Sequence, residues 1–248
     1  MTAQNCFEAF TELLPPRPGS GLAVDWAAVE EAWGLEFPSD YKNLIARYGD
    51  VLLGDYLQVI APTTVTPETC DEPGAPRGGM GFITADARET WAETEPTAIE
   101  AEPEELVTWG AASSADLFCW LTRGEPDKWA VMVFSHGDDI WTQYDFGTAE
   151  FLVRVLNAQP GVEAMKETPL WGDRNSSYVN SAERRRARGK RIGQGSQSTY
   201  DEGFAGRGGT AGQPVRDSVP PSTTTPTPFD ERDCGPDPDR ADDGPLRP

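Results

Sequence analysis

The chain has 248 residues, enough for one large domain or two small ones. Hydrophobic residues make up 38% of it, a low share for a globular chain, so part of it is expected not to fold. Residues 1–170 hold 29 acids and 9 bases, while residues 171–248 hold 12 of each, so the net charge of -20 falls on the first part. Such an anionic body repels nucleic-acid phosphates and anionic lipids and favours a basic partner.

Membrane and secreted classes are not indicated. No run approaches the roughly 18 apolar residues of a membrane span, and the N-terminal MTAQNCFEAF has no base before its apolar positions, unlike a secretory signal. Cysteines stand at 6, 70, 119 and 234, without C-x-x-C or zinc-site spacing, so free thiols are expected, buried at Cys6 and Cys119. We therefore expect a cytoplasmic protein with no membrane partner.

A change in composition divides the chain into a domain at 1–172 and a tail at 173–248. The tail has only seven Leu, Ile, Val or Phe residues in 76 positions, so it is predicted to be disordered. Within it, ERRRARGKR at 183–191 holds six bases in nine residues. This basic run could touch nucleic acid or an acidic partner, but folding back on its own acidic domain is the favoured interpretation.

Helical periodicity dominates the first 50 residues. Apolar positions predict a helix over 4–14, and the PPRPGSG segment at 15–21 ends it. Further helices are predicted over 25–34 and from residue 39 to 49, the second of them strongly amphipathic. The expected caps are Asp25 and Gly34 for one of these helices, and Ser39 or Asp40 and Gly49 for the other.

Strand-like patterns follow. The run at 52–62 is predicted as a strand, residues 66–81 as a loop, and residues 83–94 as a short helix capped by Thr84. Aromatic and β-branched residues then predict four strands joined by short loops, and a last amphipathic helix. These elements fall at 106–112, 115–122, 129–135, 140–146 and 149–158. The order predicts an α+β fold, an antiparallel meander with helices packed mainly on one face.

The line VDWAAVEEAWGLEFPSDYKNLIARYGD at 24–50 resembles the SUKH superfamily, with its Smi/Knr-like domain. DLFCWLTRGEPDKWAVMVF at 116–134 is similar to the central strands of that family, and the resemblance covers about 24–158. The loop at 63–82 and the tail depart from the family pattern. The residues that carry the resemblance are Trp33, Gly34, Phe37, Pro38, Tyr41, Tyr48, Gly49, Trp120 and Trp129.

The superfamily includes bacterial immunity proteins and fungal regulators of cell-wall synthesis. The resemblance therefore implies a non-catalytic protein that neutralises a basic, nuclease-like toxin by stoichiometric occlusion, without a cofactor. The acidic balance agrees with this, because a nuclease active site must be basic to hold phosphates. The alternative is a regulatory or scaffolding module that uses the domain and the tail to bind cellular proteins.

Enzyme-like motifs are few. The single histidine, His136, precedes Asp138 and Asp139, which invites an acid–base or metal interpretation, but a solvated turn is favoured because a metal site needs three or more convergent ligands. The RGGMG segment at 77–81 lacks the Lys-Ser/Thr ending of a phosphate loop, so a flexible loop is expected. No catalytic, cofactor-binding or metal-binding residues are predicted.

Acidic residues in and beside the predicted turns are the candidate partner-binding site. They would form one acidic rim if the turns met at one end of the sheet. Most of the eight tryptophans fall on periodic elements and are expected in the core. The candidate rim residues are Glu125, Asp127, Asp138, Asp139 and Asp145, with Asp50 and Asp55 as secondary candidates.

Overall fold

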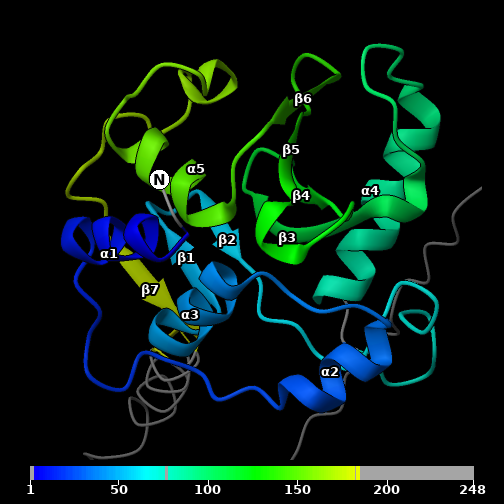
Figure 1. The fold of residues 1–248 in the computed structure, drawn as a ribbon, viewed down its shortest axis with the longest axis horizontal. Coiled ribbons are helices and arrows are strands. Elements are labelled where there is room, and N and C mark those ends of the chain that lie inside the picture. Colours follow the sequence, from blue (N-terminus) through cyan, green and yellow to red (C-terminus); the bar gives the residue numbers. More distant parts are fainter. Residues whose placement is uncertain (1–2, 76–77, 182, 185–248) are drawn as a thin grey trace, which may run out of the picture. The chain divides into compact units, whose positions relative to one another are not determined.

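A computed structural model describes residues 3–75, 78–181 and 183–184. It is an α+β protein built on one antiparallel sheet with the strand order β6-β5-β4-β3-β2-β1-β7 (Figure 1). All six strand pairs are antiparallel. The strands are β1 (Val51–Leu53), β2 (Leu57–Val59), β3 (Leu106–Ala112), β4 (Leu117–Leu121), β5 (Ala130–Ser135), β6 (Ile140–Tyr144) and β7 (Tyr178–Asn180).

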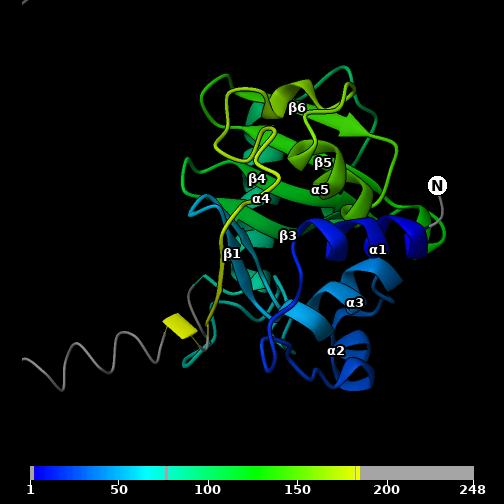
Figure 2. The same ribbon diagram turned by 90° about the vertical axis from the view of Figure 1, so that its left-hand side faces the viewer.

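Both faces of the central strands are covered. On β4, Phe118 and Trp120 point into one hydrophobic cluster, while Leu117, Cys119 and Leu121 point into another, as the two-residue period of a strand requires. The first cluster lies under α1 (Ala3–Leu13), α3 (Ser39–Tyr48) and α5 (Thr148–Leu156), which gather on one side of the strands (Figure 2). The helix α4 (Met80–Thr94) covers the second cluster. Helices therefore lie mainly, but not only, on one face.

The predicted limits of the second helix are confirmed. The helix α2 (Trp26–Trp33) begins after Asp25, whose side chain accepts a hydrogen bond of 3.3 Å from the backbone N–H of Ala28. It ends at Gly34, which has the left-handed φ of 66° that favours glycine. Both signals are local in the sequence, which is why the pattern alone could locate them.

Two predicted elements, and the predicted cap of one of them, need correction. The run at 52–62 is not one strand but the hairpin of β1 and β2, because Gly54 and Asp55 both adopt positive φ and reverse the chain. The helix predicted over 83–94 begins at Met80. Thr84 does not cap it, because its buried hydroxyl accepts a 3.0 Å hydrogen bond from the backbone N–H of Thr108 on β3.

The described domain also extends past the predicted boundary at 172. The strand β7 pairs with β1, and the rings of Tyr178 and Tyr48 pack edge to face with their centroids 5.4 Å apart. The Tyr178 hydroxyl donates a 3.0 Å hydrogen bond to the carbonyl of Pro15. A three-residue strand in a polar segment leaves no compositional signal. The rest of the predicted tail, from residue 185 on, lies outside the described residues.

Candidate functional site

Except for Asp50, the candidate acidic residues fall at two opposite ends of the sheet. In an antiparallel meander, successive turns lie at alternate ends. The loop 122–129 and the link 145–147 lie at one end, which we call the Asp127 end. The turns 54–56, 113–116 and 136–139 lie at the other, which we call the His136 end. The single acidic rim that the sequence suggested is therefore not formed.

The His136 end is organised around a carboxylate that was not among the candidates. Asp116 accepts hydrogen bonds of 2.5 Å from the hydroxyls of both Tyr56 and Ser114. It also accepts a 2.9 Å bond from the backbone N–H of His136, so it joins three turns. Burial, and secondly the bond to Asp116, raises the pKa of Tyr56 above its usual value. The candidates Asp55, Asp138 and Asp139 are exposed around this hub.

At the Asp127 end, two carboxylates cap two helices. Asp127 accepts a 2.6 Å hydrogen bond from the backbone N–H of Ser39, the first residue of α3. Asp40 is not the N-cap of its own helix, because that position belongs to Pro38. It accepts a 2.8 Å bond from the backbone N–H of Ala149, in the first turn of α5, and a 2.7 Å bond from that of Tyr41. Both carboxylates thus lie at the positive ends of helix dipoles.

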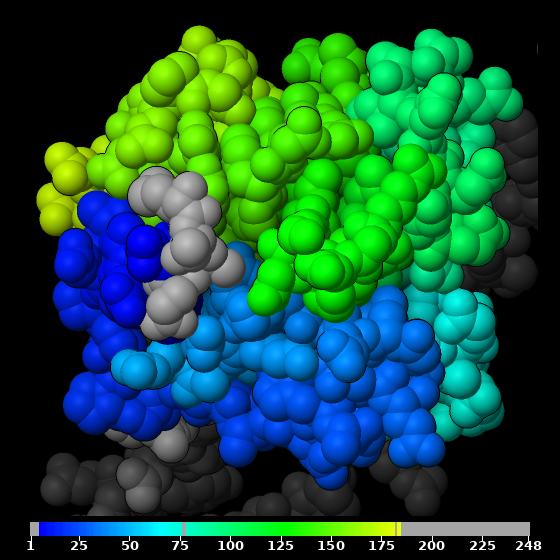
Figure 3. Space-filling model, viewed as in Figure 1, coloured from blue at the N-terminus to red at the C-terminus, as the bar shows by residue number. Residues whose placement is uncertain are grey.

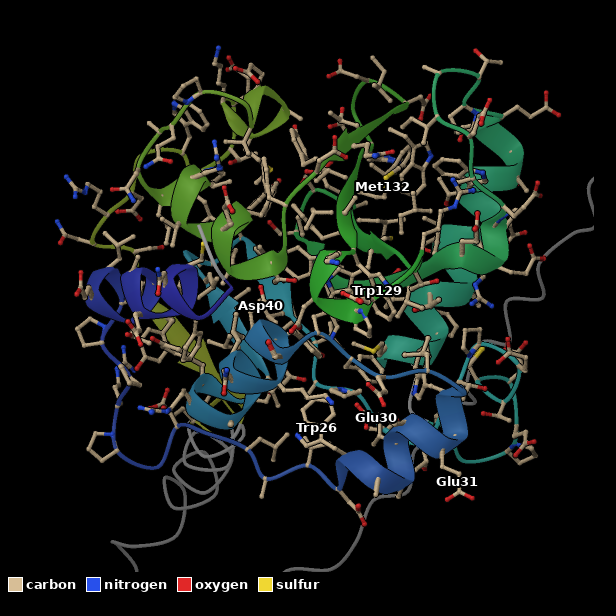
Figure 4. All side chains as sticks on the ribbon, in the orientation of Figure 1. Trp26, Glu30, Glu31, Asp40, Trp129 and Met132 are labelled. Atoms are coloured by element: carbon tan, nitrogen blue, oxygen red, sulfur yellow. The ribbon has the colours of Figure 1, made fainter. Side chains whose placement is uncertain are left out.

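Asp40 is the buried member of this pair, with 3% of its surface exposed (Figure 4). Burial raises the pKa of its carboxyl, the bonds from Ala149 and Tyr41 oppose that rise, and the negative charge of Asp127 adds to it. The net result is a pKa above the usual aspartate value. Burial of the carboxyl therefore outweighs the two hydrogen bonds that favour its charged form.

A cleft of about 250 Å³ opens beside these carboxylates. Asp145 accepts a 2.7 Å bond from the side chain of Gln143, and Glu150 forms a 2.6 Å ion pair with Arg154. Lys128 is the only cation in the lining, and Glu125 already pairs with it at 2.8 Å. The lining residues are Cys6, Asp40, Asp127, Lys128, Asp145, Phe146, Gly147 and Glu150.

A more apolar groove of about 470 Å³ lies on the other side of the same loop. Leu35 and Pro126 contribute its accessible apolar surface, and the almost fully buried Trp129 lies beneath them. In Figure 3, the green segment that contains the loop 122–129 packs against the blue segment between α2 and α3. The short helical turn Pro126–Lys128 thus separates an acidic cleft from an apolar groove.

Asp50 lies apart from both ends, where α3 leads into β1. It accepts hydrogen bonds from the side chain of Gln58 and, at 2.7 Å, from the hydroxyl of Ser181. The guanidinium of Arg184, the first base of the basic run, lies 3.6 Å from its carboxylate. Asp50 therefore already has a cationic partner within the chain.

The residues that carry the SUKH resemblance build the core or its edges. The hydroxyl of Tyr41 donates a 2.5 Å hydrogen bond to the carbonyl of Ile60, and the hydroxyl of Tyr48 donates one of 2.5 Å to the carbonyl of Leu14. The Trp120 indole donates a 2.8 Å bond to the hydroxyl of Thr148. Phe37 and Trp129 are buried, and the partly buried Trp33 donates a hydrogen bond from its indole to the carbonyl of Thr63. Pro38 directly precedes α3, Gly34 ends α2, and Gly49 ends α3.

Sequence reasoning missed an acidic stripe on α4. Asp86, Glu89 and Glu93 have the i, i+3, i+7 spacing that places side chains on one helical face, and all three are exposed. That spacing was the available signal. The base in this stretch, Arg88, turns inward to Glu68 at 3.1 Å and to the carbonyl of Leu106 at 3.2 Å. Further exposed acids follow at Glu95, Glu100, Glu102 and Glu104.

Most cations of the described chain already have an acidic partner. Of ten described Lys and Arg residues, seven form ion pairs within the chain, against 31 described Asp and Glu residues. Lys128, exposed beside Glu125, has its pKa raised by that contact. The surface is therefore left with a large surplus of carboxylates.

Within the ranges the structure covers, no three His, Cys, Asp or Glu side chains come together in a way that could hold a metal ion. Cys6, Cys70 and Cys119 are buried free thiols, as expected for Cys6 and Cys119, and burial raises the pKa of Cys119 to about 12. Cys234 and part of the RGGMG segment lie outside the described residues. None of the helices that the structure describes is long and apolar enough to cross a membrane.

The fold and the site together define an α+β protein with a seven-stranded antiparallel sheet and an acidic surface. Comparisons with protein-family models, with curated proteins and with solved structures find no match to this chain.

Proposed function

We propose that this chain is a non-catalytic, immunity-type protein that binds a basic, nuclease-like toxin and neutralises it by stoichiometric occlusion. The observation that carries the proposal is the surplus of carboxylates, since seven of ten described cations are paired within the chain. A surface with this imbalance attracts a cationic partner and suppresses binding to nucleic acid. The resemblance to SUKH immunity proteins supplies the toxin as the partner class.

The Asp127 end is the proposed contact surface. Stable protein interfaces combine an apolar centre with polar and charged surroundings, and charge alone seldom supplies the affinity. The loop 122–129 brings these two features together, because the apolar groove at Leu35 and Pro126 and the acidic cleft at Asp145 lie on its two sides. The α4 stripe would act at longer range, by steering the partner.

This arrangement supports the proposed occlusion of a basic groove. A Lys or Arg side chain of the toxin would enter the cleft beside Asp145 and Glu150, where Lys128 is already neutralised by Glu125. An apolar side chain next to it would cover Leu35 and Pro126. The basic groove of the toxin would then be filled by protein, and its nucleic-acid substrate would be excluded.

The experiment is a titration, with the full-length protein, of the product of any toxin gene that lies beside the gene for this chain. The proposal predicts that toxin activity falls linearly to an end point at one molar equivalent. It also predicts that complex formation weakens as salt is raised, because the contact is charge-driven. Neutralisation at catalytic, substoichiometric amounts would contradict the proposal, and so would an affinity that does not depend on salt.

A further inference from the structure

The strand β6 forms one edge of the sheet, and Figure 1 shows it at the end of the row made by β3, β4 and β5. On its inner side, β6 pairs with β5 at five successive positions, from Ile140 to Tyr144. Within the described ranges, no turn, loop or cap hydrogen bond involves the backbone of residues 140–143. Alternate N–H and C=O groups of this strand therefore point outward, without a partner in that part of the chain.

The other edge of the sheet is closed by its own chain. The strand β7 has only three residues, and the backbone N–H of Asn180 donates a 3.2 Å hydrogen bond to the carboxylate of Glu183. The side chain of Asn180 in turn accepts a 2.8 Å hydrogen bond from the backbone N–H of Glu183. Of the two edges, β6 is thus the longer one, and it lacks such a closure among the described residues.

The strand β6 also lacks the devices that usually protect an edge, which are Lys or Pro residues and bulges. Its sequence, IWTQY, contains neither Lys nor Pro, and its register with β5 is continuous. Ile140 is 56% exposed, a large value for an apolar side chain. An exposed edge of this kind is a template for the addition of another strand.

The charges around β6 select which strand can be added. Asp138 and Asp139 precede β6 and Asp145 follows it, all exposed, while residues 129–153 contain no Lys or Arg. A second copy of this chain is disfavoured, because antiparallel pairing of two β6 strands about Thr142 places Asp139 opposite the second copy's Asp145. A strand that carries cations is instead attracted by the same carboxylates.

We propose that β6 accepts an extended segment of another protein as an eighth strand, and that this segment carries Lys or Arg at its ends. Backbone hydrogen bonds join the segment to β6, and one of its apolar side chains covers Ile140. Its cations lie beside Asp138 and Asp139. This strand-addition site differs from the contact surface proposed at the Asp127 end, and it does not depend on a toxin as the partner.

A synthetic peptide of alternating Thr and Val, with two Lys at each end, is the probe. It is titrated into the isotopically labelled full-length protein, and amide exchange is followed residue by residue by NMR. The proposal predicts that exchange at alternate amides of residues 140–143 slows by about tenfold or more at saturation. The same peptide N-methylated at its Thr and Val amides keeps its charge but cannot donate these hydrogen bonds, so it should cause no slowing.

Two double variants separate the edge from the general charge of the domain. Asp138→Lys/Asp139→Lys should weaken peptide binding by about fivefold or more. Asp86→Lys/Glu89→Lys makes the same change in net charge on the exposed face of α4, and should weaken binding by about twofold or less.

Equal losses in the two variants would overturn the proposal, and so would equal binding of the N-methylated peptide or slowed exchange only outside β6. A dimer of the free protein that the peptide dissociates, detected by analytical ultracentrifugation, would also overturn it. The edge would then belong to a second copy of this chain.

Discussion

Both ends of the sheet carry several acidic residues but use them differently. At the His136 end, Asp116 binds three neighbouring turns, and Asp138 and Asp139 stand exposed around it. At the Asp127 end, Asp40 and Asp127 cap two helices beside a cleft and an apolar groove. The difference teaches that acid content alone does not define a binding site. Neighbouring apolar surface and shape distinguish the two ends.

The largest expected effect on stability is at Asp40. Asp40→Ala removes the acceptor for two backbone N–H groups, those of Tyr41 and Ala149, and leaves them buried. We expect a loss of about 2 kcal/mol in the free energy of unfolding, measured by urea denaturation. A loss below about 0.5 kcal/mol would mean that the cap on α5 contributes little.

The hub at the other end should matter less. Asp116→Ala removes three hydrogen bonds. Two of the groups that lose a partner, on Ser114 and His136, are exposed and can form hydrogen bonds with water instead. We expect a loss of about 1 kcal/mol in the same measurement. A loss larger than that of Asp40→Ala would reverse the ranking of the two ends.

A smaller effect concerns pH. Because the pKa of Asp40 in the folded protein is raised above the usual aspartate value of 3.8, the folded protein binds this proton more tightly than the unfolded chain does. The ionised carboxylate therefore costs stability above the folded pKa, and that cost disappears as the pH falls through the folded pKa to below 3.8.

Asp40→Asn cannot titrate, so urea denaturation of both proteins between pH 3 and pH 8 checks the sign. The wild type should gain stability relative to Asp40→Asn as the pH is lowered through this window. A relative loss on acidification would show that the pKa of Asp40 is instead lowered in the folded protein.

The smallest effect is expected at Asp138. Its side chain is exposed in the turn 136–139. Asp138→Asn should change the free energy of unfolding by less than about 0.5 kcal/mol. A clear loss of stability would show that this turn is not simply solvated, as the sequence suggested.

The sequence predicted those features of the fold that depend on residues close together in the chain. Asp25 and Gly34 delimit α2 as expected, and the four meander strands were located because their patterns are local. The site depends on distant pairs. Asp40 and Ala149 are separated by 109 positions, so nothing local indicated that Asp40 would cap α5. Similarly, Asp127 and Asp138 lie at opposite ends of the sheet because the pairing of β4, β5 and β6 places successive turns at alternate ends.

The most direct test of the account compares binding at the two ends. The double variant Glu125→Lys/Asp145→Lys reverses two charges at the Asp127 end, and Asp138→Lys/Asp139→Lys makes the same change in net charge at the His136 end. Affinity for the toxin should fall by about a hundredfold or more in the first variant and by about threefold or less in the second, measured by calorimetry. Equal losses in both variants, or a larger loss in the second, would contradict the assignment of the Asp127 end as the contact surface.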